Sequence, residues 1–137
     1  MEEEIVIKEK TVVAERKPEI VDSQGVVNTP KNVADIIVKT TLNPLFTNEK
    51  FTEWGNYRIV DICCGSGNFL LAAYEFIINR YVEYYMKNDL ETAIQRGILI
   101  RDTANNFKLS YEQKRTILQK NIWGVDIDIL AVEVAKF

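Results

Sequence analysis

Histidine is absent from this sequence of 137 residues, and cysteine occurs only as the adjacent pair Cys63 and Cys64. Without histidine, the chain can form no Ser-His or Cys-His nucleophilic pair and has no imidazole base. Two neighbouring thiols are a poor basis for a disulfide and cannot form a zinc site. We expect both to pack as small apolar side chains. Any chemistry must therefore use carboxylates, amides, hydroxyls or a bound cofactor.

The sequence also lacks an apolar run of the roughly 20 residues that would cross a bilayer. Its acidic start, Met1–Glu4, is the opposite of a signal peptide. We therefore expect a soluble, cytoplasmic protein with no membrane partner. Basic residues are not in excess, because 17 Lys and Arg stand against 20 Asp and Glu. Nucleic-acid backbones are held by clustered basic residues, so these residues are not expected to bind DNA by themselves.

The first half of the chain predicts a leader, a helix and a strand. Residues 1–24 mix charges with short β-like pairs, and we interpret them as a leader with one short strand or helix. Thr29-Pro30 predicts a helix start with a hydroxyl N-cap, and Asn43-Pro44 predicts its end. Residues 57–63 are a short apolar run typical of a strand buried on both faces.

The second half predicts two more helices and a second strand. A long helix is expected from Asn68, with Leu70, Ala73, Ile77, Tyr81 and Tyr84 along one stripe. An excursion over residues 86–109 is expected to follow it. Ser110 and Gln113 have capping-box spacing and predict a helix to about Lys120. Residues 122–127 predict a strand, and Asp128 is expected to cap the next helix. This order is the opening half of a doubly wound α/β fold with parallel strands. We expect Trp54, Trp123 and the helical tyrosines 74, 81, 84 and 85 to be packing residues.

A glycine turn between a strand and a helix start suits a ligand that approaches the backbone. Gly65 and Gly67 supply this turn, and Asp126 ends the next predicted strand, where it can accept hydrogen bonds from a ribose diol. A nucleoside-containing ligand is therefore predicted. The nicotinamide pattern does not fit, because a third glycine is missing and Asp126 lies 59 positions after Gly67.

Three segments resemble motifs of DNA amino-methyltransferases. Residues 61–70, DICCGSGNFL, resemble motif I, and residues 124–128, GVDID, resemble motif II. Residues 25–34, GVVNTPKNVA, resemble motif X, which precedes motif I in the gamma-ordered class. The chain thus resembles the cofactor-binding part of adenine-N6 methyltransferases of restriction–modification systems, including the type that is fused to a nuclease.

This resemblance implies a partial class I, Rossmann-like methyltransferase domain over residues 25–137, with S-adenosylmethionine as its cofactor. Thr29 and Pro30 would hold the methionine carboxylate end, Asp126 the ribose hydroxyls, and Ile127 the adenine ring. The remaining residues implied to bind the cofactor belong to the strand end and glycine loop: Asp61, Cys63, Gly65, Gly67, Asn68 and Phe69. Ile62 and Cys63 depart from the family, which usually has proline and a small residue there.

The family's catalytic Asp/Asn-Pro-Pro-Phe/Tyr loop has no counterpart in this sequence. Asn43-Pro44-Leu45-Phe46 is similar, but it lacks the second proline and stands where a helix is expected to stop. The chain alone is therefore expected to be inactive, with DNA bound through regions missing from it. Two alternatives stay open: a non-catalytic assembly module that forms homo-oligomers, and a methyltransferase part that acts on protein or RNA.

Overall fold

The computed structural model describes residues 3–8, 11–16 and 29–136. The first two ranges are strands β1 (Glu3–Lys8) and β2 (Thr11–Arg16), which pair antiparallel with Ile5 opposite Ala14. The expected leader therefore contains a hairpin, whereas its sequence suggested one short strand or a helix. Residues 17–24 of the leader and residues 25–28 of the motif X match lie outside the described residues.

Helix α2 (Lys31–Leu42) begins one residue later than expected. Pro30 occupies the N-cap position with an extended ψ of 141°, and no side chain caps the helix. Its carbonyl oxygen accepts the N–H groups of Val33 and Ala34 at 3.0 and 3.1 Å. The predicted hydroxyl cap from Thr29 is therefore wrong, because Pro30 rather than Thr29 is the last extended residue. The predicted end at Asn43 is confirmed.

A 3₁₀ helix, η1 (Asn48–Asn56), separates α2 from strand β3 (Ile59–Asp61). No helix was expected over these residues from the sequence. Its Trp54 is fully buried, as predicted for a packing residue, and its ring lies 5.4 Å from that of Phe46, which is also fully buried. The buried Asn121 amide donates to the carbonyl oxygen of Trp54 at 2.9 Å, so η1 is fixed to a segment far along the chain.

Helix α3 (Asn68–Asn88) is the longest element and the centre of the packing. Leu70, Ala73 and Ile77 are buried along the stripe that the sequence predicted. Further along, the ring of Tyr84 stacks on Phe51 with centroids 3.6 Å apart. The predicted packing role of the helical tyrosines is confirmed, since tyrosines 74, 81, 84 and 85 all contact the core.

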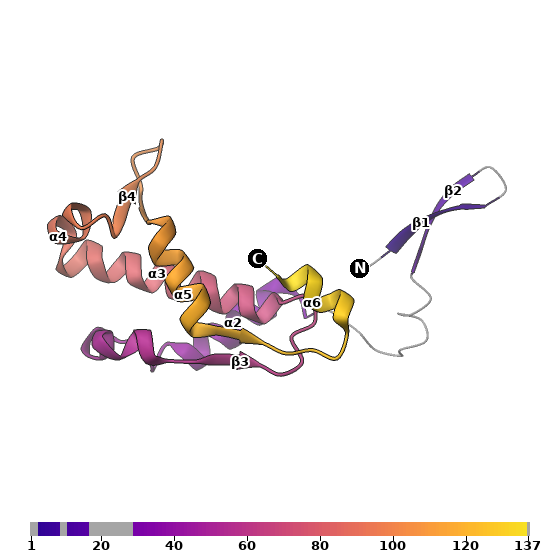
Figure 1. Ribbon diagram of the computed structural model, residues 1–137, viewed down its shortest axis with the longest axis horizontal. Coiled ribbons are helices and arrows are strands. Elements are labelled where there is room, and N and C mark those ends of the chain that lie inside the picture. The colour runs from indigo at the N-terminus through magenta and orange to yellow at the C-terminus, as the bar shows by residue number, and fades with distance from the viewer. Residues whose placement is uncertain (1–2, 9–10, 17–28, 137) are drawn as a thin grey trace.

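The excursion forms a helix and a hairpin at the C-terminal end of α3, as Figure 1 shows. It comprises α4 (Leu90–Gln95), β4 (Leu99–Arg101) and β5 (Phe107–Leu109), with the two strands antiparallel. Helix α5 (Tyr111–Asn121) follows. Ser110 is its N-cap residue as predicted, but its side chain makes no capping bond, so the predicted capping box is not formed.

Strand β6 (Ile122–Gly124) pairs with β3 in the predicted parallel direction, with Ile59 opposite Ile122. Helix α6 (Ile129–Ala135) follows. Asp128 caps it as predicted, accepting the N–H groups of Leu130 and Ala131 at 2.9 and 3.3 Å. The structure is thus mixed α/β, with a short parallel sheet and flanking helices. Among the described residues, no helix is long and apolar enough to span a membrane.

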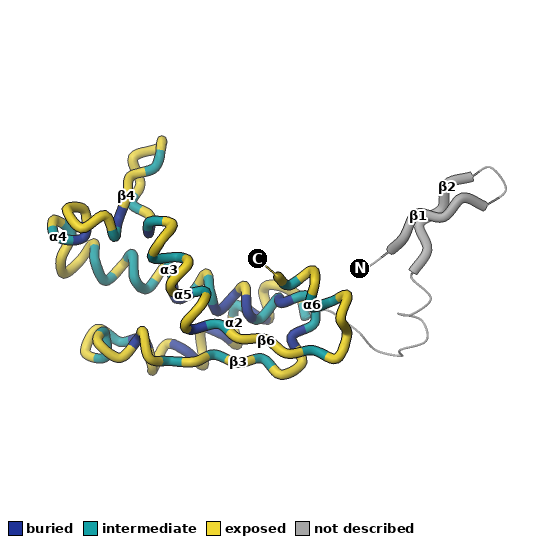
Figure 2. Tube along the Cα trace, viewed as in Figure 1, coloured by how far each residue is buried: buried dark blue, intermediate teal, exposed yellow. Residues whose placement is uncertain are grey.

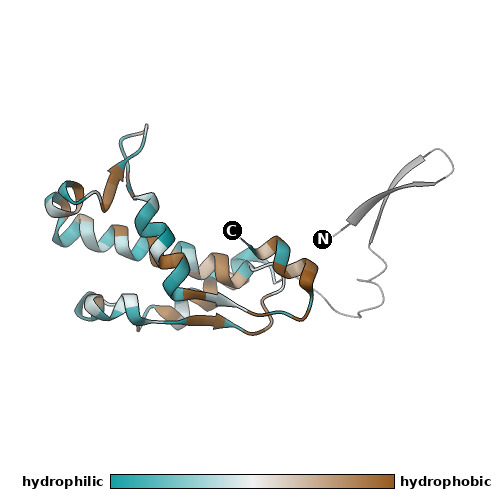
Figure 3. Ribbon diagram, viewed as in Figure 1, coloured by the Kyte–Doolittle hydropathy of each residue, from teal (hydrophilic) through white to brown (hydrophobic). Residues whose placement is uncertain are grey.

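One face of the β3–β6 sheet is uncovered in the described part of the chain. Val60 and Trp123 are register partners and therefore share a face, and they are 56% and 52% exposed. The predictions of a strand buried on both faces and of a packed Trp123 are both wrong, because helices cover only the opposite face. Figure 2 shows exposed residues along this sheet, and Figure 3 shows apolar residues both there and on α6.

Candidate functional site

The glycine turn between β3 and α3 has the backbone geometry that the sequence predicted. Gly65 has a φ of 50° and Gly67 a φ of 86°, both in the region that side chains disfavour. The N–H of Gly67 donates to the carbonyl oxygen of Cys64 at 2.8 Å and closes the turn. Gly67 is also the N-cap residue of α3. The first N–H groups of a helix have no intrahelical partner, so a ligand at this turn would meet hydrogen-bond donors.

Asp126 lies beside this turn, although it is 61 positions away from it in the chain. One carboxylate oxygen accepts the N–H of Gly65 at 2.7 Å, and the other accepts the N–H of Asp128 at 2.8 Å. The bonds from Asp128 and Gly65 hold the pKa of Asp126 below its ordinary value, so the side chain is ionised at neutral pH. Each carboxylate oxygen has a second lone pair, which leaves room for hydroxyl donors.

Asp61 connects the end of β3 to the same turn. Its side chain accepts the N–H of Cys63 at 3.1 Å, and its backbone carbonyl accepts the N–H of Val125 at 2.9 Å. The N–H of Cys64 in turn donates to the carbonyl oxygen of Val125 at 3.0 Å. Asp61 therefore caps the turn, and its implied role near the cofactor stays a prediction.

The start of α2 reaches the start of α3 through one side chain. Asn68 Nδ2 donates to the carbonyl oxygen of Thr29 at 3.2 Å. Pro30, the next residue, is exposed. Segments from all three motif-like stretches are thus brought together: Thr29-Pro30, the glycine turn, and the strand end at Asp126.

The two cysteines differ. Cys64 is buried, and burial, followed by the negative charges of Asp126 and Asp61, raises the pKa of its thiol. The thiol therefore stays protonated, which suits the predicted packing role. Cys63 is exposed, so the same prediction is wrong for Cys63. It stands two residues after the capping carboxylate of Asp61, at a point where the chain has left the sheet.

Two apolar candidates lie on different sides of the turn. Phe69 is half-buried and lines an apolar groove of about 370 Å³ between α2 and β3. Ile127, directly after Asp126, is 99% exposed. An isoleucine with no cover beside a ribose-binding candidate is in a suitable place to contact a base.

Comparison of the sequence with models of protein families shows the family of the chain. The family model described as N-6 DNA Methylase matches residues 13–137. The chain belongs to this family. The match includes the glycine turn, Asp126 and the start of α2, which are the parts that converge in the structure.

Two curated proteins are similar to this N-6 DNA methylase family member. The type II restriction enzyme and methyltransferase RM.Eco57I of Escherichia coli is 33% identical over 121 residues, covering 88% of this chain and 11% of that protein. The putative type II restriction enzyme and methyltransferase RM.MjaORFECS2P of Methanocaldococcus jannaschii is 27% identical over 131 residues, covering 91% and 10%. The chain therefore spans about a tenth of the length of these relatives.

The Asn43-Pro44-Leu45-Phe46 segment has a structural role in the described fold. Phe46, the aromatic residue of the Asn43-Pro44-Leu45-Phe46 segment, is fully buried in the core and cannot stack on a base. Asn43 caps the end of α2, as the helix-stop interpretation predicts. In the described residues, no group of three or more acidic, cysteine or histidine side chains is placed to hold a metal ion.

One residue important to the site's geometry was not singled out from the sequence. A Cβ on Gly124 would lie 2.6 Å from Leu70 Cδ1 and 3.0 Å from Cys64 Sγ. Gly124 therefore allows β6 to lie directly against the glycine turn and the first turn of α3. Its place two residues before the motif II acid was the only signal in the sequence, and it did not distinguish packing from ligand approach.

Proposed function

We propose that this chain is the S-adenosylmethionine-binding part of an adenine-N6 DNA methyltransferase of a restriction–modification system. The observation that carries the proposal is the convergence of Gly65 and Asp126, whose amide and carboxylate lie 2.7 Å apart. A glycine turn at a helix start and an acid at the next strand end are the two halves of a nucleoside site. We assign the protein to the type IIG-like systems, in which the methyltransferase is fused to a nuclease, because the names of both relatives combine restriction enzyme and methyltransferase.

In this proposal each segment has one task. Thr29 and Pro30 meet the amino-acid end of the cofactor, the glycine turn passes its methionine portion, and Ile127 covers the adenine. Asp126 keeps its two backbone bonds and uses its remaining lone pairs for the ribose hydroxyls. When bound, the cofactor supplies an activated methyl group for the amino nitrogen of a flipped-out adenine. Residues 25–137 form the cofactor-binding unit, and its fold is the first half of a Rossmann-like methyltransferase sheet.

The remaining polypeptide of the intact protein would supply the catalytic loop and the DNA contacts. The chain has three prolines, Pro18, Pro30 and Pro44, and none is adjacent to another. An Asn-Pro-Pro-Tyr type loop is therefore not formed from these residues. We expect no N6-methyladenine when the 137-residue chain is incubated with duplex DNA and S-adenosylmethionine, and appearance of that product would contradict this part of the proposal.

Calorimetric titration with S-adenosylmethionine tests the binding site directly. We expect binding by the chain and a loss of at least about tenfold in affinity for Asp126→Ala, because charge-assisted hydrogen bonds are the strong ones. Asp89→Ala is the matched control. It removes an exposed carboxylate at the far end of α3, about 30 Å from the glycine turn, and should leave the affinity unchanged. Equal affinities of Asp126→Ala and the unmodified chain would refute the ribose assignment.

A second candidate function, a non-catalytic assembly module, is favoured by the uncovered sheet face. Val60 and Trp123 lie side by side there, and Ile62 beyond β3 is 75% exposed. Such a face can be covered by a second copy of the chain. Sedimentation at increasing concentration tests this, with Trp123→Glu as the disrupting variant. A chain that stays monomeric, or a variant that self-associates as before, would contradict the module.

A further inference from the structure

Asn68 is the first residue of α3, yet its side chain does not cap its own helix. The N-cap residue is Gly67, which has no side chain to offer. The amide of Asn68 turns instead toward α2 and donates to the carbonyl oxygen of Thr29 at 3.2 Å. Both residues are half-buried, and they are 39 positions apart in the chain. This bond therefore joins the glycine turn to the segment that enters α2.

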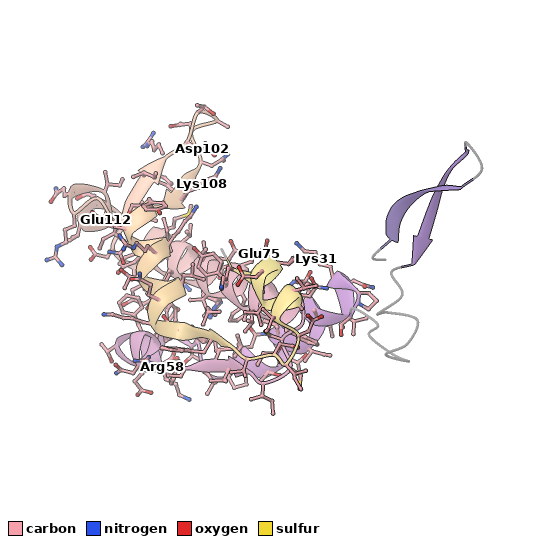
Figure 4. The ribbon with its side chains drawn as sticks, turned by 45° about the vertical axis from the view of Figure 1, so that its right-hand side comes forward. Lys31, Arg58, Glu75, Asp102, Lys108 and Glu112 are labelled. Atoms are coloured by element: carbon pink, nitrogen blue, oxygen red, sulfur yellow. The ribbon has the colours of Figure 1, made fainter. Side chains whose placement is uncertain are left out.

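Apart from the apolar packing of the two helices, a second polar contact joins α2 to α3, and it is weaker. Lys31 Nζ lies 3.2 Å from Glu75 Oε2, and Figure 4 shows the two labelled side chains close together. Their side chains are 68% and 46% exposed. Exposed ion pairs fix little, because solvent screens them and both side chains are flexible. The Asn68 bond is better placed to fix the backbone, since it ends on a main-chain oxygen just before Pro30.

We propose that Asn68 is a positioning residue that holds the Thr29-Pro30 segment against the glycine turn. The inference rests on the proposed function and deepens it, because that segment is the one assigned to the amino-acid end of the cofactor. A segment that is already in place need not be ordered when the ligand binds, so its tether contributes to affinity without touching the ligand. The contribution should concern the amino-acid end and leave the nucleoside end unaffected.

Two ligands distinguish the amino-acid end of the cofactor site from its nucleoside end. S-adenosylhomocysteine carries both the nucleoside and the amino-acid group, whereas 5′-methylthioadenosine lacks the amino-acid carboxylate and amine. We expect Asn68→Ala, which removes the donor without adding a charge, to weaken S-adenosylhomocysteine binding about 3- to 10-fold, the effect of one hydrogen bond. Affinity for 5′-methylthioadenosine should change less than about twofold. Asn79→Ala, on the exposed side of the same helix, should change neither.

The possible results distinguish failure of the Asn68 inference from failure of the proposed function. Equal weakening of both ligands would overturn the inference and make Asn68 a general stabiliser of the turn, and no weakening of either would also overturn it. If the unmodified chain binds neither ligand, the proposed function itself fails, and this is seen before any variant is made.

A measurement without ligand checks the tether itself. The backbone amide resonances of Lys31 and Asn32 should shift in Asn68→Ala, while those of Leu42 and Asn43 at the far end of α2 should not. Unshifted resonances at the start of α2 would show that no tether exists and would overturn the inference.

Discussion

The carboxylate of Asp126 accepts the backbone N–H of Gly65 at 2.7 Å, across 61 positions of sequence. Its second oxygen accepts the N–H of Asp128, the residue that caps α6. One side chain therefore joins the glycine turn, the end of β6 and the start of the last helix. The shape of the turn depends on the presence and on the charge of this carboxylate, and both dependences can be measured without a ligand.

Removing the carboxylate should loosen the turn. In Asp126→Ala the Gly65 amide loses its acceptor, and we expect its hydrogen exchange to accelerate about tenfold or more, as for other charge-assisted bonds. Asp126→Asn keeps one carbonyl oxygen, so the exchange rate of its Gly65 amide should lie between those of the unmodified chain and Asp126→Ala. Exchange is followed residue by residue by NMR. The amide of Asn106, which is bonded to Asp102 in the distant hairpin, is the internal control and should not change. An unaltered Gly65 exchange rate in both variants would mean that the conformation of the turn does not depend on the Asp126 carboxylate.

Acid should remove the same bond. The N–H groups of Asp128 and Gly65 hold the pKa of Asp126 below its ordinary value near 3.8. A carboxyl group whose pKa is lower in the folded state stabilises the protein above its unfolded pKa, and this contribution is lost as the pH falls through the folded pKa. We therefore expect the urea midpoint to be unaffected by this group from pH 7 to 5 and to decline below about pH 4.

A second lowered group provides the control for this pH profile. The pKa of Asp102 is held below its ordinary value by Lys108 and then by the N–H of Asn106, within the β4–β5 hairpin. Asp102→Asn and Asp126→Asn should each lessen the decline below pH 4. Only Asp126→Asn should change Gly65 exchange. If the urea midpoint depends on pH in the same way in Asp126→Asn and in the unmodified chain, Asp126 does not contribute to the loss of stability in acid.

Local signals in the sequence predicted the elements that depend on local chemistry. The 3.6-residue spacing after Gly67 predicted α3 with its buried face at Leu70 and Ile77, and both residues are buried. Asp128 was predicted to cap a helix, and its bonds to Leu130 and Ala131 confirm this. The parallel pairing of β3 and β6 followed from strand, helix and strand in order.

The features that the sequence did not predict depend on residues far apart in the chain. The apolar run of β3 predicts a strand covered on both faces, and nothing within this run or that of β6 indicates that Val60 and Trp123 are exposed among the described residues. The buried amide of Asn121 serves η1, more than 60 positions earlier. The Thr29–Asn68 bond likewise appears only when two helix starts meet. The cofactor roles of these site residues remain predictions from the resemblance.

Gly124 should tolerate no side chain. A Cβ there would lie 2.6 Å from Leu70 Cδ1 and 3.0 Å from Cys64 Sγ, and both side chains are buried, so at least one of them must shift. We expect Gly124→Ala to reduce the free energy of unfolding by about 1–3 kcal/mol, the usual cost of overpacking. Gly55→Ala meets nothing within 4 Å and is the matched control, with a change within about 0.5 kcal/mol. Equal urea midpoints for the two variants would show that β6 can move away from the turn.

Asn121 should be essential to the core although it is far from the glycine turn. It is 2% exposed, and its amide donates to the carbonyl oxygens of Trp54 and Tyr57 at 2.9 and 2.8 Å. Asn121→Leu has a similar size but no donor, so both carbonyls lose a partner. We expect a loss of about 2–4 kcal/mol in the free energy of unfolding. Asn88→Ala, which removes an exposed bond to Tyr84, should cost less than about 0.5 kcal/mol.

Tryptophan fluorescence can separate this local effect from general destabilisation. Trp54 is fully buried and Trp123 is half exposed, so a Trp123→Phe background leaves the emission of Trp54 alone. In that background, Asn121→Leu should shift the emission of the folded protein to longer wavelength, because η1 is no longer held against α5 and water reaches the indole. Asn88→Ala should leave the spectrum unchanged. A destabilised Asn121→Leu protein with an unshifted folded spectrum would mean that η1 stays in place, and that the cost comes only from the two hydrogen bonds lost at the carbonyl groups of Trp54 and Tyr57.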